Sequence, residues 1–137
     1  MSGHEKAPLS ILLIDHGSRR GEAHRQLLNI AKRLEDRLAE GTPASTPAIV
    51  EIAHMELAEP NIAQGFSRCV SRGAKHVIAI PCLLSRGRHV QEDIPTLLEN
   101  AATESPGVTF ALSAPLSEHA GFIELLLSAA HATRSAD

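Results

Sequence analysis

Short apolar runs alternate with longer amphipathic stretches along the whole chain. Each run is mainly apolar and is followed by a loop, and the first is apolar throughout after Ser10, which is typical of a strand in the interior of a parallel sheet. Four such strands are predicted, over residues 10–14, 49–55, 76–80 and 108–114.

The stretches after the first two runs carry apolar residues at helical spacing. The first covers residues 21–39, with its charged residues mainly off the apolar stripe. Its expected inward residues are Leu27, Ile30, Ala31, Leu34 and Leu38. The second helix is predicted to open at residue 60 or 61 and to close at Gly73, since proline favours a first turn and glycine a carboxyl cap.

The third and fourth helices follow the third and fourth strands. Asp93 is predicted to cap the amino terminus of the third helix, and its first turn can hold Pro95 because the missing N–H has no partner there. Its expected inward residues are Leu97, Leu98 and Ala101. The last helix is predicted over residues 122–130, followed by a frayed polar tail.

The order strand–helix, repeated four times, predicts the fold class. Parallel-type strands that alternate with helices form an open, doubly wound α/β sheet with right-handed crossovers and helices on both faces. We therefore expect a flavodoxin-like, four-stranded parallel sheet in a single domain over residues 1–137, with residues 1–8 and 131–137 flexible.

Composition narrows the classes of function. The chain has 137 residues, 43% of them hydrophobic, which suffices for one compact domain without a disulfide or a structural metal. A formal charge of −3 and an aromatic content of 2% argue against a nucleic-acid partner. No apolar run approaches the length that crosses a bilayer, and the polar start resembles no secretory signal.

The two cysteines indicate a reducing compartment. Cys69 and Cys82 lie in apolar contexts without CxxC spacing, so they are interpreted as reduced core residues of a cytoplasmic protein. Two cysteines do not supply the ligands of an iron–sulfur cluster, and none is expected.

Chemistry-bearing residues gather in the loops after the first and third strands. In an α/β sheet, ligands bind at the carboxyl ends of the strands. Each of these loops holds one histidine, two arginines and a serine. They are His16, Ser18, Arg19 and Arg20 in the first loop, and Ser85, Arg86, Arg88 and His89 in the second.

Two histidines and a glutamate on this edge suggest a metal. Imidazole suits zinc, cobalt, nickel and iron, and Glu56, at the end of the second strand, can complete a site with His16 and His89 or accept protons. Each residue also has a purely structural explanation. His16 could cap the end of its strand through a backbone hydrogen bond, and His89 could be a solvated residue in the first turn of a helix. Glu56 could be a glutamate that the dipole of the following helix favours. His54 is expected to be buried or half-buried.

The four arginines suggest an anionic ligand. Arginine binds carboxylates and phosphates through a bidentate fork, although two or three of the four would be solvated. Neither loop contains a Walker or GxGxxG pattern, so nucleotide binding is not supported. His24 and His76 are expected at the surface or at a helix edge.

Several segments together resemble the sirohydrochlorin chelatase family of class II tetrapyrrole chelatases. They are Leu-Ile-Asp-His-Gly-Ser-Arg over residues 13–19, Met-Glu-Leu-Ala-Glu-Pro over 55–60, the Gly-x-His-Val-x-x-Asp-Ile-Pro element over 87–95, and Pro-Leu-Ser-Glu-His over 115–119. They follow the family's order over nearly the whole chain. One departure is Asp15, which stands where the family commonly has a small residue.

The resemblance implies a chelatase-like fold and insertion of cobalt or iron, with nickel as a further candidate, into sirohydrochlorin. It implies that no nucleotide is used, that the product enters cobalamin or siroheme synthesis, and that the short form acts as a homodimer. His16 and His89 would hold the metal, Glu56 would assist catalysis, and the loop arginines and serines would grip the substrate's carboxylates.

Two alternatives remain open from the sequence. One is a non-catalytic carrier of metal or tetrapyrrole with the same sheet edge. The other is a histidine phosphatase, whose active site also opens with strand-His-Gly. Its motif, however, is Arg-His-Gly, and Asp15 would repel phosphate.

Overall fold

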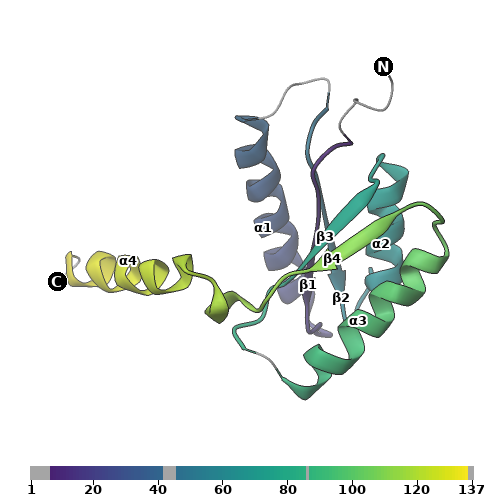
Figure 1. Cartoon of the computed structure of the whole chain (residues 1–137). Helices are drawn as coiled ribbons and strands as arrows, with labels where there is room; N and C mark the ends of the chain where they lie inside the picture. The colour runs from purple at the N-terminus through teal and green to yellow at the C-terminus, as the bar shows by residue number, and fades with distance from the viewer. Residues whose placement is uncertain (1–6, 42–45, 86, 136–137) are drawn as a thin grey trace.

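A parallel sheet of four strands lies at the centre of the protein (Figure 1). The computed structural model describes residues 7–41, 46–85 and 87–135, and of residues 88–91 and 135 only the backbone. The strands are β1 (Ser10–Asp15), β2 (Ile49–His54), β3 (His76–Pro81) and β4 (Thr109–Leu112). They lie in the order β2-β1-β3-β4 and all pair in parallel, which confirms the predicted α/β fold class.

Helices cover both faces of the sheet, but unequally. α1 (Gly21–Ala39) packs on β1 and β2 on one face, whereas α2 (Ile62–Ser71) and α3 (Arg88–Thr103) pack on the other. After a short 3-10 helix, η2 (Leu116–Glu118), the last helix α4 (Gly121–Ser135) extends away from the sheet (Figure 1).

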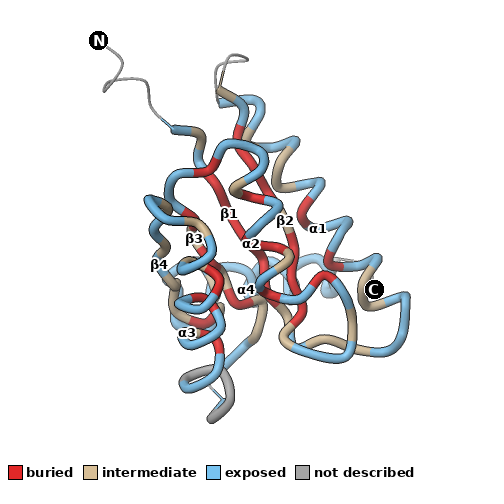
Figure 2. The backbone as a smooth tube through the Cα atoms, turned by 90° about the vertical axis from the view of Figure 1, so that its right-hand side faces the viewer, coloured by how far each residue is buried: buried red, intermediate tan, exposed pale blue. Residues whose placement is uncertain are grey.

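The sheet separates two apolar cores, and Figure 2 shows the buried residues concentrated along the strands. Successive residues of a strand point to opposite faces, so Leu12 and Ile14 pack toward α2 and α3 while Ile11 and Leu13 pack toward α1. This two-sided burial is the reason that β1 is a continuous apolar run. The two cysteines are free as predicted, with Cys69 in the larger core and Cys82 half-buried.

Two helix predictions differ from the structure in detail. On α1, Ile30 is 46% exposed, because it lies about 60° around the helix from Leu27, whose side chain faces the sheet. α4 continues past residue 130 to Ser135. Residues 129–132 are mostly alanine, which has a high helix propensity.

The predicted start of α3 is wrong. The helix begins at Arg88, with Gly87 as its N-cap in an extended conformation, so Asp93 lies in the second turn and does not cap the helix. Pro95 is consequently inside the helix and removes one backbone hydrogen bond there. Leu98 is buried as expected, but Leu97 is 37% exposed because it lines a hollow.

Candidate functional site

His16 and Glu56 meet where β1 and β2 end. The Nε2 atom of His16 lies 3.5 Å from the Oε1 atom of Glu56, and both side chains are more than half exposed. The backbone holds them there, because the Met55 N–H donates to the Asp15 carbonyl and the Glu56 N–H donates to the His16 carbonyl. The pairing of the two strands thus continues beyond their ends and aligns two functional side chains.

Gly17 makes this close approach sterically possible. Its φ is +101°, and a Cβ atom at this position would lie 1.8 Å from the carbonyl oxygen of Glu56. Only glycine can place backbone so near to another chain segment in this conformation. The loop after β1 therefore reaches the end of β2 because residue 17 has no side chain.

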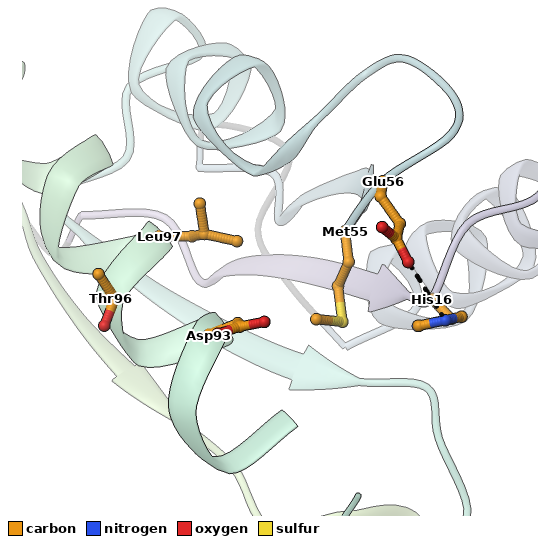
Figure 3. Close-up of a pocket in the computed structure, with 6 residues that line it drawn as sticks. All are labelled: His16, Met55, Glu56, Asp93, Thr96 and Leu97. Atoms are coloured by element: carbon orange, nitrogen blue, oxygen red, sulfur yellow. Dashed lines mark ion pairs between the residues drawn. The ribbon is translucent and has the colours of Figure 1, made fainter. Parts of the chain in front are cut away.

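A hollow of about 420 Å³ adjoins the pair. His16 comes from the end of β1, and one wall comes from the second turn of α3 and beyond (Figure 3). The lining residues are His16, Met55, Glu56, Asp93, Thr96 and Leu97. An imidazole and two carboxylates beside an apolar wall can attract a divalent cation and accept protons.

The structure places some of the other predicted site residues near this edge. Ser18 is half-buried and its hydroxyl accepts a hydrogen bond from the Arg20 N–H at 3.1 Å. The side chains of Arg19 and Arg20 are exposed at the start of α1, and Ser85 is exposed after β3. The first loop therefore presents two cationic groups to solvent beside His16.

The second loop is described only in part. Arg86 lies outside the described residues, and the side chains of Arg88 and His89 do so as well. The backbone of His89 is in the first turn of α3, four residues before Asp93. Among the side chains that the structure describes, no three histidine, cysteine, aspartate or glutamate residues gather closely enough to hold a metal ion. Of the predicted metal site, the structure describes the side chains of His16 and Glu56.

A second polar cluster lies on the α1 side of the same strand ends. Asp15 and His54 are partners in register on β1 and β2, and the His54 Nδ1 atom lies 2.5 Å from the Asp15 carboxylate. The carboxylate accepts, so the Nδ1 atom of His54 donates to it, and the Nε2 atom of His54 forms a hydrogen bond with the Nδ1 atom of His24, 3.0 Å away. His54 is buried as expected, and His24, predicted at the surface or at a helix edge, is half-buried on α1 in this cluster.

The cysteine beside the site is a neutral thiol. Burial, and then the negative charge of Asp15, raise the pKa of Cys82 to about 11. Burial likewise raises the pKa of Cys69 to about 11. Since metals bind the thiolate, neither cysteine favours metal binding at neutral pH.

Four of the lining residues, Met55, Asp93, Thr96 and Leu97, are not among the predicted site residues. Asp93, Thr96 and Leu97 line the hollow because α3 begins at residue 88, and the spacing of i, i+3 and i+4 then puts them on one helical face. That spacing was visible in the sequence, but Asp93 had been interpreted as the helix cap.

The described helices include none with the length and apolarity needed to cross a bilayer.

Comparison with known proteins gives a consistent result. The family model described as CbiX matches residues 10–133. The chain is 45% identical over 109 residues to the chloroplastic sirohydrochlorin ferrochelatase of Arabidopsis thaliana, covering 80% of this chain and 45% of that protein. It is 31% identical over 127 residues to the sirohydrochlorin cobaltochelatase of Priestia megaterium, covering 92% and 38%. The chain thus spans less than half the length of these relatives.

Solved structures share the fold. The CbiX protein of Marinobacter aquaeolei superposes with a TM-score of 0.74 at 24% identity, covering 95% of this chain and all of that one. The sirohydrochlorin chelatase SirB of Bacillus subtilis subspecies spizizenii, solved in complex with cobalt, gives a TM-score of 0.68 at 29% identity, covering 80% and 44%.

Proposed function

The chain belongs to the CbiX family of sirohydrochlorin chelatases, and we propose that it inserts a divalent metal ion, cobalt or iron, into sirohydrochlorin. The reaction exchanges two pyrrole protons of the macrocycle for one metal ion and uses no nucleotide. The observation that carries the proposal is the His16–Glu56 pair, 3.5 Å apart beside the hollow. Cobalamin and siroheme synthesis both use this substrate.

His16 receives the metal substrate. A neutral imidazole is a good ligand for Co²⁺ and Fe²⁺, and also for Ni²⁺. The His16 side chain is 55% exposed, so an ion bound there keeps part of its hydration and is held loosely. It can then be released as the pyrrole nitrogens replace the imidazole. His89, in the first turn of α3, is proposed as the second ligand.

Glu56 accepts protons from the macrocycle. Its carboxylate lies beside His16, where it would attract the cation and accept a proton from a pyrrole N–H of a bound macrocycle. Asp93 lines the same hollow from α3. The carboxylates of Glu56 and Asp93 would provide one acceptor for each of the two pyrrole protons. The metal ion, held by His16, would then not compete with the protons for one side chain.

The substrate's peripheral carboxylates are proposed to bind the cationic loops. The exposed Arg19 and Arg20 offer bidentate donors next to His16. Ser18 and Ser85 add hydroxyl donors, and Arg86 and Arg88 are proposed to act in the same way from the second loop. The chain is also proposed to act as a homodimer.

The test is the visible absorbance of sirohydrochlorin mixed with protein and Co²⁺, and then with Fe²⁺, against a control without protein. The chain has no Trp and no Tyr, so it adds little absorbance of its own. A spectral change faster than the control supports insertion and ranks the metals. Tight binding without acceleration would indicate a carrier, and release of phosphate from a generic ester would indicate a phosphatase.

A further inference from the structure

Three side chains form a chain of hydrogen bonds from the end of β1 to the beginning of α1. The Nδ1 atom of His54 lies 2.5 Å from the Asp15 carboxylate, and its Nε2 atom lies 3.0 Å from the Nδ1 atom of His24. His54 is 1% exposed, and His24 is half-buried on α1. Because both ring nitrogens of His54 have a partner and the ring is enclosed, the imidazole keeps one orientation and fixes the two side chains that it contacts.

The face of β2 on which His54 lies is otherwise apolar. Val50 and Ile52 belong to the core beneath α1, and His54 follows them at the same spacing of two along the strand. An apolar side chain at position 54 would continue that core without burying a polar group. The histidine adds direction instead, since hydrogen bonds restrict distance and angle between β2 and α1 more narrowly than apolar packing does.

One end of this hydrogen-bonded chain adjoins the His16–Glu56 pair. Asp15 directly precedes His16, and Asp15 and His54 are partners in register on β1 and β2. The backbone bond from the Met55 N–H to the Asp15 carbonyl is 3.0 Å long, and the next one, from the Glu56 N–H to the His16 carbonyl, is 3.3 Å long. The Asp15–His54 contact thus holds the two strands together at the point where their backbone pairing lengthens.

The other end adjoins the exposed arginines. Arg20 is the N-cap of α1 and Arg19 precedes it, with both side chains exposed. His24 lies about one helical turn after Arg20. The His24–His54 contact therefore connects the loop of the two arginines with the end of β2.

We infer that His24 and His54 are positioning residues, which hold the two arginines before α1 at a fixed distance from the proposed metal site. A tetrapyrrole bound through its peripheral carboxylates is then centred over the groups that exchange the metal ion and the protons. Arginines that have moved would hold the macrocycle off centre, and it would reach those groups only by giving up part of the bidentate bonds. This inference rests on the proposed function and adds how its two halves are kept in register.

The test compares the insertion kinetics of His24→Leu and His24→Asn with those of the wild type. Leucine cannot bond to His54, so kcat is expected to fall at least about tenfold. KM for sirohydrochlorin and the Co²⁺ concentration for half-maximal rate should stay within about threefold, because the binding groups themselves are intact. The amide of asparagine stands as many bonds from the backbone as Nδ1 does, so His24→Asn is expected to recover most of the rate. Gln26→Leu, exposed on the same part of α1, is the matched control and should keep wild-type kinetics.

A background without the arginines separates positioning from a general loss of structure. When Arg19→Gln and Arg20→Gln are already present, adding His24→Leu is expected to change kcat by less than about twofold, because no guanidinium group remains to hold the macrocycle off centre. A tenfold fall in both backgrounds would show that His24→Leu acts on the metal site directly, and it would overturn the inference. An unchanged kcat in His24→Leu, or an equal fall in His24→Asn, would overturn it as well.

Insertion by the wild type is measured first, so that two failures can be told apart. A wild type that does not insert metal overturns the proposed function and this inference with it, whereas insertion without the expected effects overturns the inference alone. Urea unfolding checks that each variant is folded, and His24→Ala takes the place of His24→Leu if leucine prevents folding.

Discussion

A Cβ atom on residue 17 would lie 1.8 Å from the carbonyl oxygen of Glu56. That distance is far below any van der Waals contact. The loop after β1 can therefore pack against the end of β2 only because residue 17 has no Cβ atom. The same approach brings the His16 imidazole within 3.5 Å of the Glu56 carboxylate. The geometry of the site therefore depends on a residue that carries no functional group.

Gly17→Ala is expected to destabilise the protein and to disrupt the site. The positive φ and the overlap with Glu56 together cost roughly 2 to 4 kcal/mol, and the loop must move to relieve the overlap. We expect the unfolding free energy in urea to fall by that amount and metal insertion to fall at least about tenfold.

Gly73→Ala is the matched control for that prediction. Gly73 has a φ of +107°, but nothing lies within 4 Å of its missing Cβ. Its substitution should cost only the backbone term, about 1 kcal/mol, with insertion unchanged. Equal effects of the two substitutions would show that the contact with Glu56 is unimportant.

Glu56→Gln and His16→Ala separate the two proposed roles at the site. The amide of Gln keeps the shape of the carboxylate but cannot take a proton, so kcat for insertion is expected to fall by about 10² or more. His16→Ala removes the metal ligand, so its main effect should be on the concentration of Co²⁺ needed for half-maximal rate. Steady-state insertion kinetics with both substrates varied measure the two effects.

His76→Ala is the control for that pair. His76 is the exposed first residue of β3. It therefore lies at the amino-terminal end of the strands, whereas His16 follows the carboxyl end of β1. Its loss should leave both kinetic constants within about twofold of the wild type. Wild-type rates in Glu56→Gln would exclude this carboxylate as the proton acceptor.

The paired substitution Arg19→Gln with Arg20→Gln is expected to raise KM for sirohydrochlorin while kcat changes little. Both guanidinium groups are exposed at the start of α1, where they would bind substrate carboxylates in the ground state and the transition state alike. The salt dependence of KM should weaken in the variant, because fewer charges are screened. Arg33→Gln, exposed further along α1, should leave KM unchanged.

The strands and the first site residues were predictable because their signals are local. A continuous apolar run that ends in a loop identifies β1, and His16 follows it directly. The helix start at Arg88 was not predictable in the same way. Asp93 and Pro95 form a good local signal for a helix start, but in the structure one more turn precedes them and the helix begins at Arg88.

Other features depend on contacts between distant segments. His24 is a helix-edge residue in the sequence, and only the packing of α1 over β2 brings it to His54. Asp15, the departure from the family pattern, finds its partner 39 residues away in the chain. The apolar pattern of α4 predicts burial, but a sequence pattern cannot say which surface, or which copy of the chain, provides it.

Stability is expected to decline between about pH 9 and pH 11, in part through Cys82. The ordinary pKa of a thiol is near 9, and burial beside Asp15 raises the pKa of Cys82 to about 11 in the folded protein. Above pH 9 the unfolded chain loses this proton while the folded chain keeps it. The free energy of unfolding therefore falls as the pH rises toward 11. Urea unfolding of Cys82→Ala should therefore show a shallower decline over this range than the wild type.

His54→Phe is expected to destabilise the protein clearly, although it removes no proposed ligand. Phenylalanine fills a similar volume but cannot form the hydrogen bonds to Asp15 and His24, and His54 itself is only 1% exposed. Leaving a carboxylate without its buried donor costs about 2 to 3 kcal/mol. Because Asp15 precedes His16, relaxation of the freed carboxylate should also displace the imidazole and lower insertion. His76→Phe is an exposed substitution of the same kind that removes only the hydrogen bond to the Thr109 hydroxyl, so it should change the unfolding free energy by no more than about 1 kcal/mol. A similar loss in both variants would show that the Asp15–His54–His24 cluster contributes nothing specific.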